Sequence, residues 1–377
     1  MALDTKEFGA KLVRYREQLE LVLSEVATYT GIEQSRLADL ERGLQLPTGD
    51  EVLILADFYK CDYRFFISNE KLAPFEQTEN LYRRHGNEFS KEDRWRVQEF
   101  LFLCEIEQVL MQELGTRFAA FDFIPKGNFY KLHGQEAAAA LRQHLGYESN
   151  QVGGDVYSDF RKIGFHIFRR HLANSNISGL MIRHPFAGPC ILVNYSEDIY
   201  RQRFTAAHEA GHAILDREDF VVSFLKAPGN LVEVRANTFA SSYLLPPSFL
   251  KNIPVEDWSR DTLIHWASKL NVSAIALAIG LKENGVITED EYSTISSTKV
   301  PAHQKSDPEL RGLEARQLER KQHLLERGLS TFYVSLCFDS LAAGKITNAR
   351  AAEMLLISET ELSELAALFR INLFAHD

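Results

Sequence analysis

Two histidines four residues apart, with a glutamate beside the first, are the side chains of this sequence best suited to chemistry. They are His208 and His212, with Glu209 between them. On a helix, residues i and i+4 lie one above the other, so both imidazoles can reach one tetrahedral zinc ion at roughly 2.1 Å. The carboxylate of Glu209 can then contact a water bound to that metal. The spacing therefore predicts a zinc-hydrolase site in which Glu209 is the general base.

Such a site needs a third ligand, and the sequence offers two acidic candidates. Residues 233–240 predict a second helix, on which Glu233 and Asn237 share one face. Glu233 would complete a site of two histidines and one glutamate, and Asn237 could orient a ligand through a hydrogen bond. Asp216 is the competing ligand, but it lies about 12 Å beyond His208 along the same helix. Unless that helix breaks, ligand reach favours Glu233.

The helices that position these ligands are predicted from their apolar patterns. An apolar stripe at helical spacing marks the helix of the histidines as buried; it consists of Phe204, Ala207, Gly211, Ile214 and Leu215. The second helix carries small residues one turn apart, Ala236 and Ala240. Small residues on both helices predict a close contact, through which the third ligand can approach the histidines.

Two strands are predicted before the metal helix, at 177–184 and 190–195, and they favour an antiparallel sheet beside it. An edge strand of such a sheet commonly holds a peptide in extended form, so residues 191–194 are the expected substrate-binding strand. Cys190 is a candidate inhibitory ligand, because a thiolate close to the metal would displace the catalytic water. The simpler alternative is that Cys190 is a small buried residue, as free cysteines commonly are.

Residues 191–247 resemble the ImmA/IrrE-type zinc metallopeptidases. The resemblance is carried by Ile191–Asn194, Arg201–His212, Glu233 with Ala236, Asn237, Phe239 and Ala240, and Leu244–Pro246. It implies zinc on His208, His212 and Glu233, with Glu209 as general base. Ala210 stands where the family more often has leucine. Four side chains are candidates for stabilising the oxyanion, and the sequence does not choose among them: Tyr195, Tyr200, Tyr243 and His184.

The N-terminal residues show a separate pattern of helix, turn and helix. A turn at Gly31 separates a helix beginning near Leu23 from a second helix over 34–41. Together with the apolar residues that follow Pro47, this pattern resembles the Cro/C1 (XRE) helix-turn-helix domain over residues 6–68. The resemblance implies that the second helix enters the major groove of DNA.

In that case the residues nearest the base edges are Gln34, Ser35 and Arg36, and Arg42 lies near a phosphate. The charge balance opposes DNA binding, because residues 1–67 contain eight Lys and Arg against twelve Asp and Glu. Phosphate attraction would therefore be weak. The alternative is that this module binds another protein, such as a repressor of the same fold.

Composition limits the remaining possibilities. The chain has 377 residues, of which 45% are hydrophobic, and no apolar run long enough to span a bilayer. The first residues lack a basic segment followed by an apolar one, so no secretory signal is expected. The four cysteines are scattered without a C-x-x-C pair, which favours reduced thiols. We therefore expect a soluble cytoplasmic protein without a membrane partner.

The expected fold class is mainly α with a small antiparallel sheet (α+β). Five segments are predicted: a helix-turn-helix bundle (1–68), a helical linker (69–126), a zincin-like peptidase domain (127–255), a helix-turn-helix-like helical subdomain (256–300), and a charged linker with a C-terminal helical unit (301–377). The linker includes a long amphipathic helix capped at Ser90. Its apolar stripe is expected to pack within the chain, with a homodimer contact as the alternative use.

These patterns lead to an expected function. The chain should be a zinc-dependent endopeptidase with a helix-turn-helix module. The family resemblance implies that it cleaves a regulatory protein, either a repressor or a toxin–antitoxin or defence partner, to control transcription or a stress or phage response. The alternative is a DNA-binding regulator or antitoxin without catalysis, which uses the peptidase fold to bind a partner.

Overall fold

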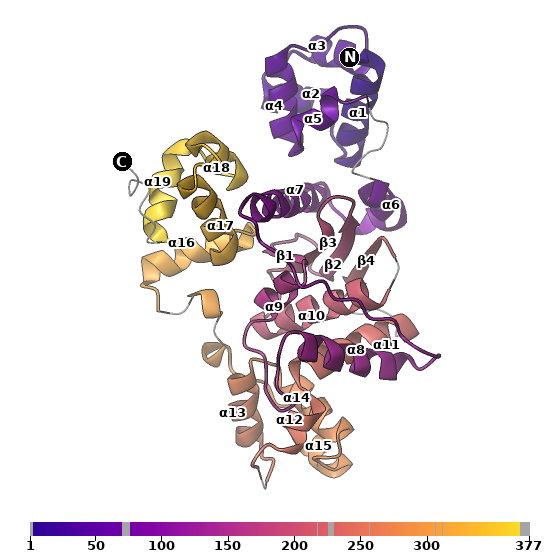
Figure 1. Cartoon of the computed structure of the whole chain (residues 1–377), viewed down its shortest axis with the longest axis vertical. Helices are drawn as coiled ribbons and strands as arrows, with labels where there is room; N and C mark the ends of the chain where they lie inside the picture. Colours follow the sequence, from indigo (N-terminus) through magenta and orange to yellow (C-terminus); the bar gives the residue numbers. More distant parts are fainter. Residues whose placement is uncertain are drawn as a thin grey trace. The chain divides into compact units, whose positions relative to one another are not determined.

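The computed structural model describes residues 3–69, 76–216, 218–224, 230–255, 257–305, 307–310 and 312–369. Over these residues the chain forms 19 α-helices and one four-stranded sheet (Figure 1). It divides into two compact units: residues 1–103 with 172–174, and residues 104–171 with 175–377. Helix α7 (Lys91–Glu113) contains the boundary between them. The α+β class predicted from the sequence is confirmed.

The first unit is built from short helices around one apolar core. These helices are α1 (Thr5–Gln18), α2 (Leu23–Thr30), α3 (Gln34–Glu41), α4 (Gly49–Tyr59), α5 (Tyr63–Ile67) and α6 (Glu76–His85), followed by the 3-10 turn η1 (Gly86–Glu88). The core includes Phe8, Leu40 and Phe66, all nearly inaccessible to solvent. A Cβ on Gly9 of α1 would lie 2.4 Å from the Glu41 carbonyl oxygen, so glycine permits α1 to cross α3 closely.

The sheet of the second unit has the order β1-β3-β2-β4. Its strands are β1 (His166–Arg170), β2 (Ile177–His184), β3 (Gly188–Asn194) and β4 (Phe220–Phe224). β2 pairs antiparallel with both β3 and β4, whereas β1 pairs parallel with β3. The sheet is therefore mixed, and the prediction of a wholly antiparallel sheet is corrected. The cause is that β3, the return strand of the β2–β3 hairpin, lies between β1 and β2.

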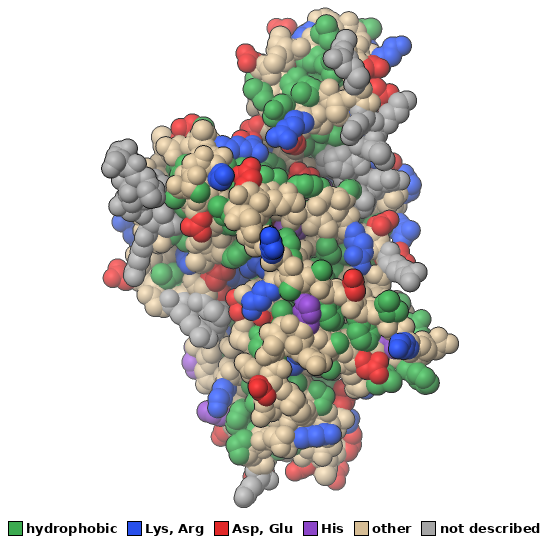
Figure 2. Space-filling model, in the orientation of Figure 1, with side chains coloured by type: hydrophobic (Ala, Val, Ile, Leu, Met, Phe, Trp, Pro, Cys, Tyr) green, Lys and Arg blue, Asp and Glu red, His purple; other side chains and the backbone are tan. Residues whose placement is uncertain are grey.

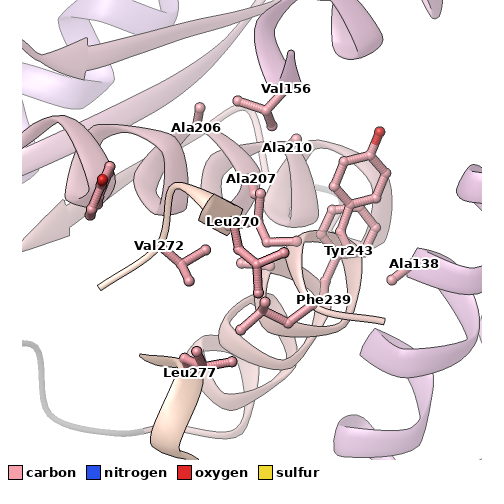
Figure 3. Close-up of a cluster of buried hydrophobic side chains, with 14 of the residues drawn as sticks. Ala138, Val156, Ala206, Ala207, Ala210, Phe239, Tyr243, Leu270, Val272 and Leu277 are labelled. Carbon is pink, nitrogen blue, oxygen red and sulfur yellow. The ribbon is translucent and has the colours of Figure 1, made fainter. Parts of the chain in front are cut away.

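One face of the sheet is covered by the long helix α10 (Ile199–Leu215). Every second residue of a strand lies on this face. The shared core contains Met181, Ile191 and Val193 of the strands with Ala206 and Ala210 of α10. Helix α11 (Leu231–Leu244) packs against α10, and α8 (Tyr130–His144) and α9 (Val156–Lys162) complete this layer. Figure 3 shows the small residues of α10 beside Phe239 and Tyr243 of α11.

The small residues predicted to mark the contact of α10 with α11 do so. A Cβ on Gly211 of α10 would lie 3.1 Å from the Phe239 ring and 3.3 Å from the Ala236 Cα atom. A Cβ on Gly134 of α8 would lie only 2.5 Å from the carbonyl oxygen of Arg235 on α11. Helix α11 therefore packs closely against α10 and α8 at positions where those helices have glycine.

The remaining helices follow in two groups. The first comprises α12 (Pro247–Lys251), α13 (Arg260–Leu270), α14 (Ala274–Glu283) and α15 (Glu289–Ile295), whose buried residues belong to the same core as α10. The 3-10 turns η2 (Ala302–Gln304) and η3 (Pro308–Leu310) lead to α16 (Ala315–Glu326), α17 (Thr331–Ala342), α18 (Asn348–Met354) and α19 (Glu359–Leu368). No single helix among the described residues has the length and apolar composition of a membrane span, although the pair α13 and α14 meets both when combined across a 102° bend.

Candidate metal centre

The side chains of His208, His212 and Glu233 converge between α10 and α11. The two histidine Nε2 atoms are 3.0 Å apart. The Glu233 carboxylate lies 3.3 Å from His208 Nε2 through one oxygen and 3.6 Å from His212 Nε2 through the other. Within the described part of the chain, this is the group of histidine, cysteine and acidic side chains whose geometry could hold a metal ion.

The donor set fits a tetrahedral metal site. Ligands at roughly 2.1 Å from a tetrahedral metal lie about 3.4 Å from one another. The two Nε2 atoms are 3.0 Å apart, and each lies 3.3 or 3.6 Å from a different oxygen of Glu233, so the separations are close to those between ligands of one metal ion. Two imidazoles and one carboxylate are also the donors that divalent transition metals of intermediate softness prefer.

Asp216 fixes the orientation of the His212 ring. Its Oδ2 atom lies 2.5 Å from His212 Nδ1, and its other oxygen pairs with the Arg235 guanidinium. With Nδ1 donating its proton to Asp216, the Nε2 lone pair faces the ligand cluster. Burial alone would lower the pKa of His212, but this hydrogen bond and the nearby carboxylates raise it overall. Asp216, the alternative third ligand in the sequence prediction, therefore contacts the far side of the His212 ring and orients it.

Asn237 does not occupy the position, close to a metal ligand, that was expected from the sequence. Asn237 lies one turn after Glu233 on α11, but its side chain is exposed. Its carbonyl oxygen accepts a hydrogen bond from Ser241, and no hydrogen bond joins its side chain to the described ligands. The structure does not bring Asn237 to the cluster. Instead, Asp216 accepts the hydrogen bond that orients a ligand, from Nδ1 of His212.

Glu209 points from α10 toward the sheet. Its side chain is wholly buried, and a Cβ on Gly179 of β2 would lie 3.2 Å from its Oε1 atom and 2.7 Å from Thr205. Ser223 of β4 pairs with Gly179 and lies on the same side. Glycine at 179 therefore leaves the space that the carboxylate occupies. The positions of Gly179 and Ser223 beside Glu209 could not be predicted from the sequence, because both depend on strand pairing.

Among the described residues, Ser223 is the side chain that hydrogen-bonds the Glu209 carboxylate, and the geometry of that contact is poor. Burial raises its pKa, and the neighbouring imidazoles of His208 and His212 oppose that rise. A buried carboxylate with so few hydrogen bonds is costly, since it has lost its water and gained little in exchange. These two oxygens fit a proton-accepting role toward a bound water at the cluster.

Cys190 does not face the cluster. Ile191 and Val193 of β3 belong to the core beneath α10, so the alternating residue Cys190 points to the opposite face of the sheet. There it neighbours Cys104 of α7, whose pKa is raised by burial and by this contact. The inhibitory-ligand hypothesis is wrong for this arrangement. The simpler alternative, a buried cysteine, describes its position.

The expected substrate strand is also corrected. Residues 191–194 belong to β3, which pairs with β1 on one side and β2 on the other. Both of its edges are used, so it cannot accept a peptide. The edge strand beside the cluster is β4, the neighbour of β2.

The four candidates for an oxyanion contact are engaged elsewhere. Tyr243 donates a hydrogen bond to Asp159 at 2.9 Å, and His184 lies 2.9 Å from Glu105. The rings of Tyr195 and Tyr200 each lie against a cationic side chain. None of these contacts involves the described ligand cluster.

Comparison with known families agrees with this geometry. Residues 160–282 match a peptidase family model described as the IrrE N-terminal-like domain. This part of the chain is therefore similar to an IrrE N-terminal-like peptidase domain. The matched segment begins in α9 and ends in α14, and it includes all three residues of the ligand cluster. Residues 7–63 match a model described as a helix-turn-helix domain. A search of curated proteins found no match to the chain.

The helix-turn-helix domain that precedes the IrrE-like domain uses its arginines internally. Arg36 of α3 donates to both oxygens of Glu51, at 2.7 and 2.8 Å, and to the Leu46 carbonyl oxygen at 2.8 Å. Arg42 pairs with Asp39 at 2.8 Å. Gln34 and Ser35 are exposed at the start of α3. On the face drawn in Figure 2, basic and acidic side chains are interspersed.

Replacing Glu51 by glutamine is expected to destabilise the helix-turn-helix domain by about 1–2 kcal/mol at neutral pH, after allowance for solvent screening. The hydrogen bond from Arg36 lowers the pKa of Glu51 to about 2, from an ordinary value of 4.5. A carboxyl with a lowered pKa contributes stability above 4.5 and loses it as the pH falls toward 2. Hydrogen exchange in α3 and α4 of the full chain would measure the difference.

The matched control is Asp57→Asn, because the Asp57 side chain is 61% exposed in its pair with Lys60. That variant should exchange like the wild type. Equal protection in the Glu51 and Asp57 variants at pH 7 would contradict the assigned importance of the Arg36–Glu51 pair.

Proposed function

We propose that this protein is a zinc-dependent endopeptidase that cleaves a specific regulatory protein. The observation that carries the proposal is the cluster of His208, His212 and Glu233, whose ligand atoms lie 3.0 to 3.6 Å apart beside the buried carboxylate of Glu209. The family match of residues 160–282 to a peptidase model supports the same reaction class. Two histidines and a glutamate, with a position left for water, are typical of catalytic rather than structural zinc.

Each residue has a role in that reaction. His208, His212 and Glu233 would hold the zinc, which when bound acts as a Lewis acid toward the peptide carbonyl and acidifies water. Glu209 accepts the proton of the attacking water and returns it to the leaving amine. Burial raises the pKa of Glu209, which makes its carboxylate a stronger base for the first of these transfers. Asp216 keeps the Nε2 lone pair of His212 directed at the metal.

The edge strand β4 is the proposed binding surface for the substrate backbone. One side of β4 pairs with β2, and its other side is the end of the described sheet. A peptide can extend such an edge through main-chain hydrogen bonds. Because Ser223 of β4 lies opposite Gly179, which adjoins Glu209, a peptide on this edge would pass beside the general base.

Methylation of peptide nitrogens tests this binding surface. In an extended peptide that spans the cleavage site, only alternate N–H groups face the neighbouring strand. Methylating that set should weaken inhibition of cleavage by about 10-fold or more, since each lost hydrogen bond costs about 1 kcal/mol. Methylating the other set is the matched control and should have little effect. Equal losses from the two sets would argue against pairing with β4.

The proposed substrate is a helix-turn-helix repressor or a similar regulator in the same cytoplasm. Two observations favour a protein rather than DNA as the partner of the N-terminal domain: both arginines near the expected interface are paired internally, and residues 1–67 are acidic overall. DNA binding is the second candidate, because the matched helix-turn-helix model supports it. The third is a regulator that binds a partner through an inactive peptidase fold.

One experiment separates these candidates. Purified protein is analysed for zinc and incubated with helix-turn-helix proteins encoded beside its gene, with and without a chelator. One zinc per chain and chelator-sensitive cleavage of one protein would support the peptidase and identify its substrate. A folded protein that takes up no zinc would overturn the proposal. A gel-shift assay with DNA from the same locus tests the DNA-binding candidate.

A further inference from the structure

A cavity of about 210 Å³ lies in the same compact unit as the ligand cluster. The cavity is bounded by α9, β1, the first turns of α10 and the residues that precede and begin α17. Three arginines line it, Arg161, Arg169 and Arg203, and we refer to it as the arginine cavity. Each of these residues is buried, with at most 9% of its surface exposed. Three buried guanidinium groups around one space are unusual, because charged groups are rarely buried without partners.

Arg203 and Arg161 each have a donor that makes no hydrogen bond of normal geometry among the described residues, although that of Arg161 is in a long ion pair. Arg203 donates from Nη1 to the Gly154 carbonyl oxygen at 2.9 Å, but its buried Nε has no hydrogen-bond partner among the described residues. Arg161 donates from Nη2 to the Ile167 carbonyl oxygen at 2.8 Å, and its Nε, which makes no hydrogen bond within the described part of the chain, lies 3.9 Å from Glu107 Oε1 in an ion pair. Each unsatisfied buried donor costs about 1–3 kcal/mol. The cavity therefore presents donors that an acceptor of suitable size would stabilise.

The third arginine already has an internal partner. Arg169 lies 2.5 Å from Oδ2 of Asp307 and 3.5 Å from Glu309. These carboxylates come from the segment that follows α15 in sequence, and both line the cavity. The Asp307 contact indicates the kind of group that the cavity accepts. A carboxylate oxygen within hydrogen-bond distance of a guanidinium is the usual partner of buried arginine.

We propose that the arginine cavity binds a small molecule that carries an oxyanion, either a phosphate or a carboxylate. Its oxygens would accept from Arg161 and Arg203 and would compete with Asp307 for Arg169. The volume restricts the ligand, because 210 Å³ lies below the roughly 300–1,000 Å³ of pockets for drug-sized ligands. A small monophosphate or dicarboxylate is the matching size. Tyr157 and Phe332 supply aromatic walls for its carbon atoms.

Arg203 links this site to the ligand cluster. It lies on α10 five residues before His208, on the helix that carries both histidines. A ligand held by Arg203 would therefore contact the helix that positions the metal ligands. This consequence for cleavage rests on the proposed function, whereas binding to the cavity does not, and the two are measured separately.

Binding is tested on the full chain by calorimetry and thermal unfolding, with inorganic phosphate and with succinate as separate probes. Chloride at the same ionic strength is the reference. The expected result is a saturable rise in melting temperature with at least one oxyanion, and the probe that acts identifies the phosphate or carboxylate class. The rise should persist after chelation, which separates the cavity from anion binding at the metal centre.

Three variants make the test specific. Arg203→Gln should weaken binding by about 10-fold or more, as expected for loss of a charge-assisted hydrogen bond. Arg201→Gln is the matched control, because Arg201 is on the same helix and its side chain is 45% exposed. Asp307→Asn should tighten binding severalfold, because it removes the carboxylate that competes for Arg169. Equal binding by the Arg203 and Arg201 variants, or no saturable shift in either the wild type or the Asp307 variant, would overturn the proposal.

Discussion

Replacing Glu209 by glutamine is expected to lower kcat/KM for proteolysis by about 10²- to 10⁴-fold, the usual contribution of a positioned general base. Glutamine has the same shape but cannot accept the proton of the attacking water. The side chain is wholly buried between α10 and the sheet. Cleavage kinetics on the identified substrate would measure the loss, and zinc content should remain at the wild-type value.

Stability measurements separate this catalytic loss from misfolding. The Glu209 carboxylate is wholly buried, and an uncharged amide is less costly to bury than a carboxylate. The chelated glutamine variant should therefore melt no lower than the chelated wild type. Glu218→Gln, at an exposed position, is the control and should retain full activity. Wild-type rates in the Glu209 variant would exclude its role as the base.

Replacing Asp216 by asparagine is expected to weaken zinc binding by about 10- to 100-fold, the typical effect of removing the carboxylate behind a histidine ligand. Asp216 accepts a hydrogen bond from His212 Nδ1 at 2.5 Å and also pairs with Arg235. Asparagine retains an acceptor oxygen but loses the negative charge, so His212 becomes a weaker and less well-oriented ligand. Competition with a chromophoric chelator would measure the affinity.

A comparison with Glu233→Gln distinguishes a residue that orients a metal ligand from one that coordinates the metal itself. Glu233 faces both histidine Nε2 atoms, whereas Asp216 contacts the opposite side of the His212 ring. The Glu233 variant should therefore lose more affinity than the Asp216 variant. Asp219→Asn, at an exposed position, should bind zinc like the wild type. The reverse order of the first two variants would indicate that Asp216 is the third ligand.

Local spacing was sufficient to predict which side chains of α10 meet. His208 and His212 are one turn apart, so a helix alone brings their rings together, and the small residues at 207 and 211 predicted the approach of α11. The role of Asp216 depends on where α10 ends. The helix stops at Leu215, and Asp216 adopts an extended conformation with φ −107° and ψ 157°, from which its carboxylate reaches His212. The i,i+4 spacing of His212 and Asp216 was the available signal.

The sheet was less predictable because strand order depends on contacts distant in sequence. The apolar run in β3 is typical of a strand buried on both faces, which is evidence for a central position rather than an edge. The error about Cys190 has a related cause, since a shift of one residue along a strand reverses the face on which a side chain lies. Neither the order of the strands nor the face of the sheet on which each side chain lies can be derived from the segment 190–194 alone.

The open edge of β4 has a consequence for selectivity. Main-chain hydrogen bonding accepts almost any extended segment, so an edge of five residues discriminates poorly between protein sequences. An exposed edge also attracts unrelated strands, a hazard that short length reduces. In the proposed enzyme, the choice of substrate must therefore come largely from tethering. A domain that captures one regulator raises the effective concentration of its scissile segment, and weak pairing at the edge is then enough for cleavage.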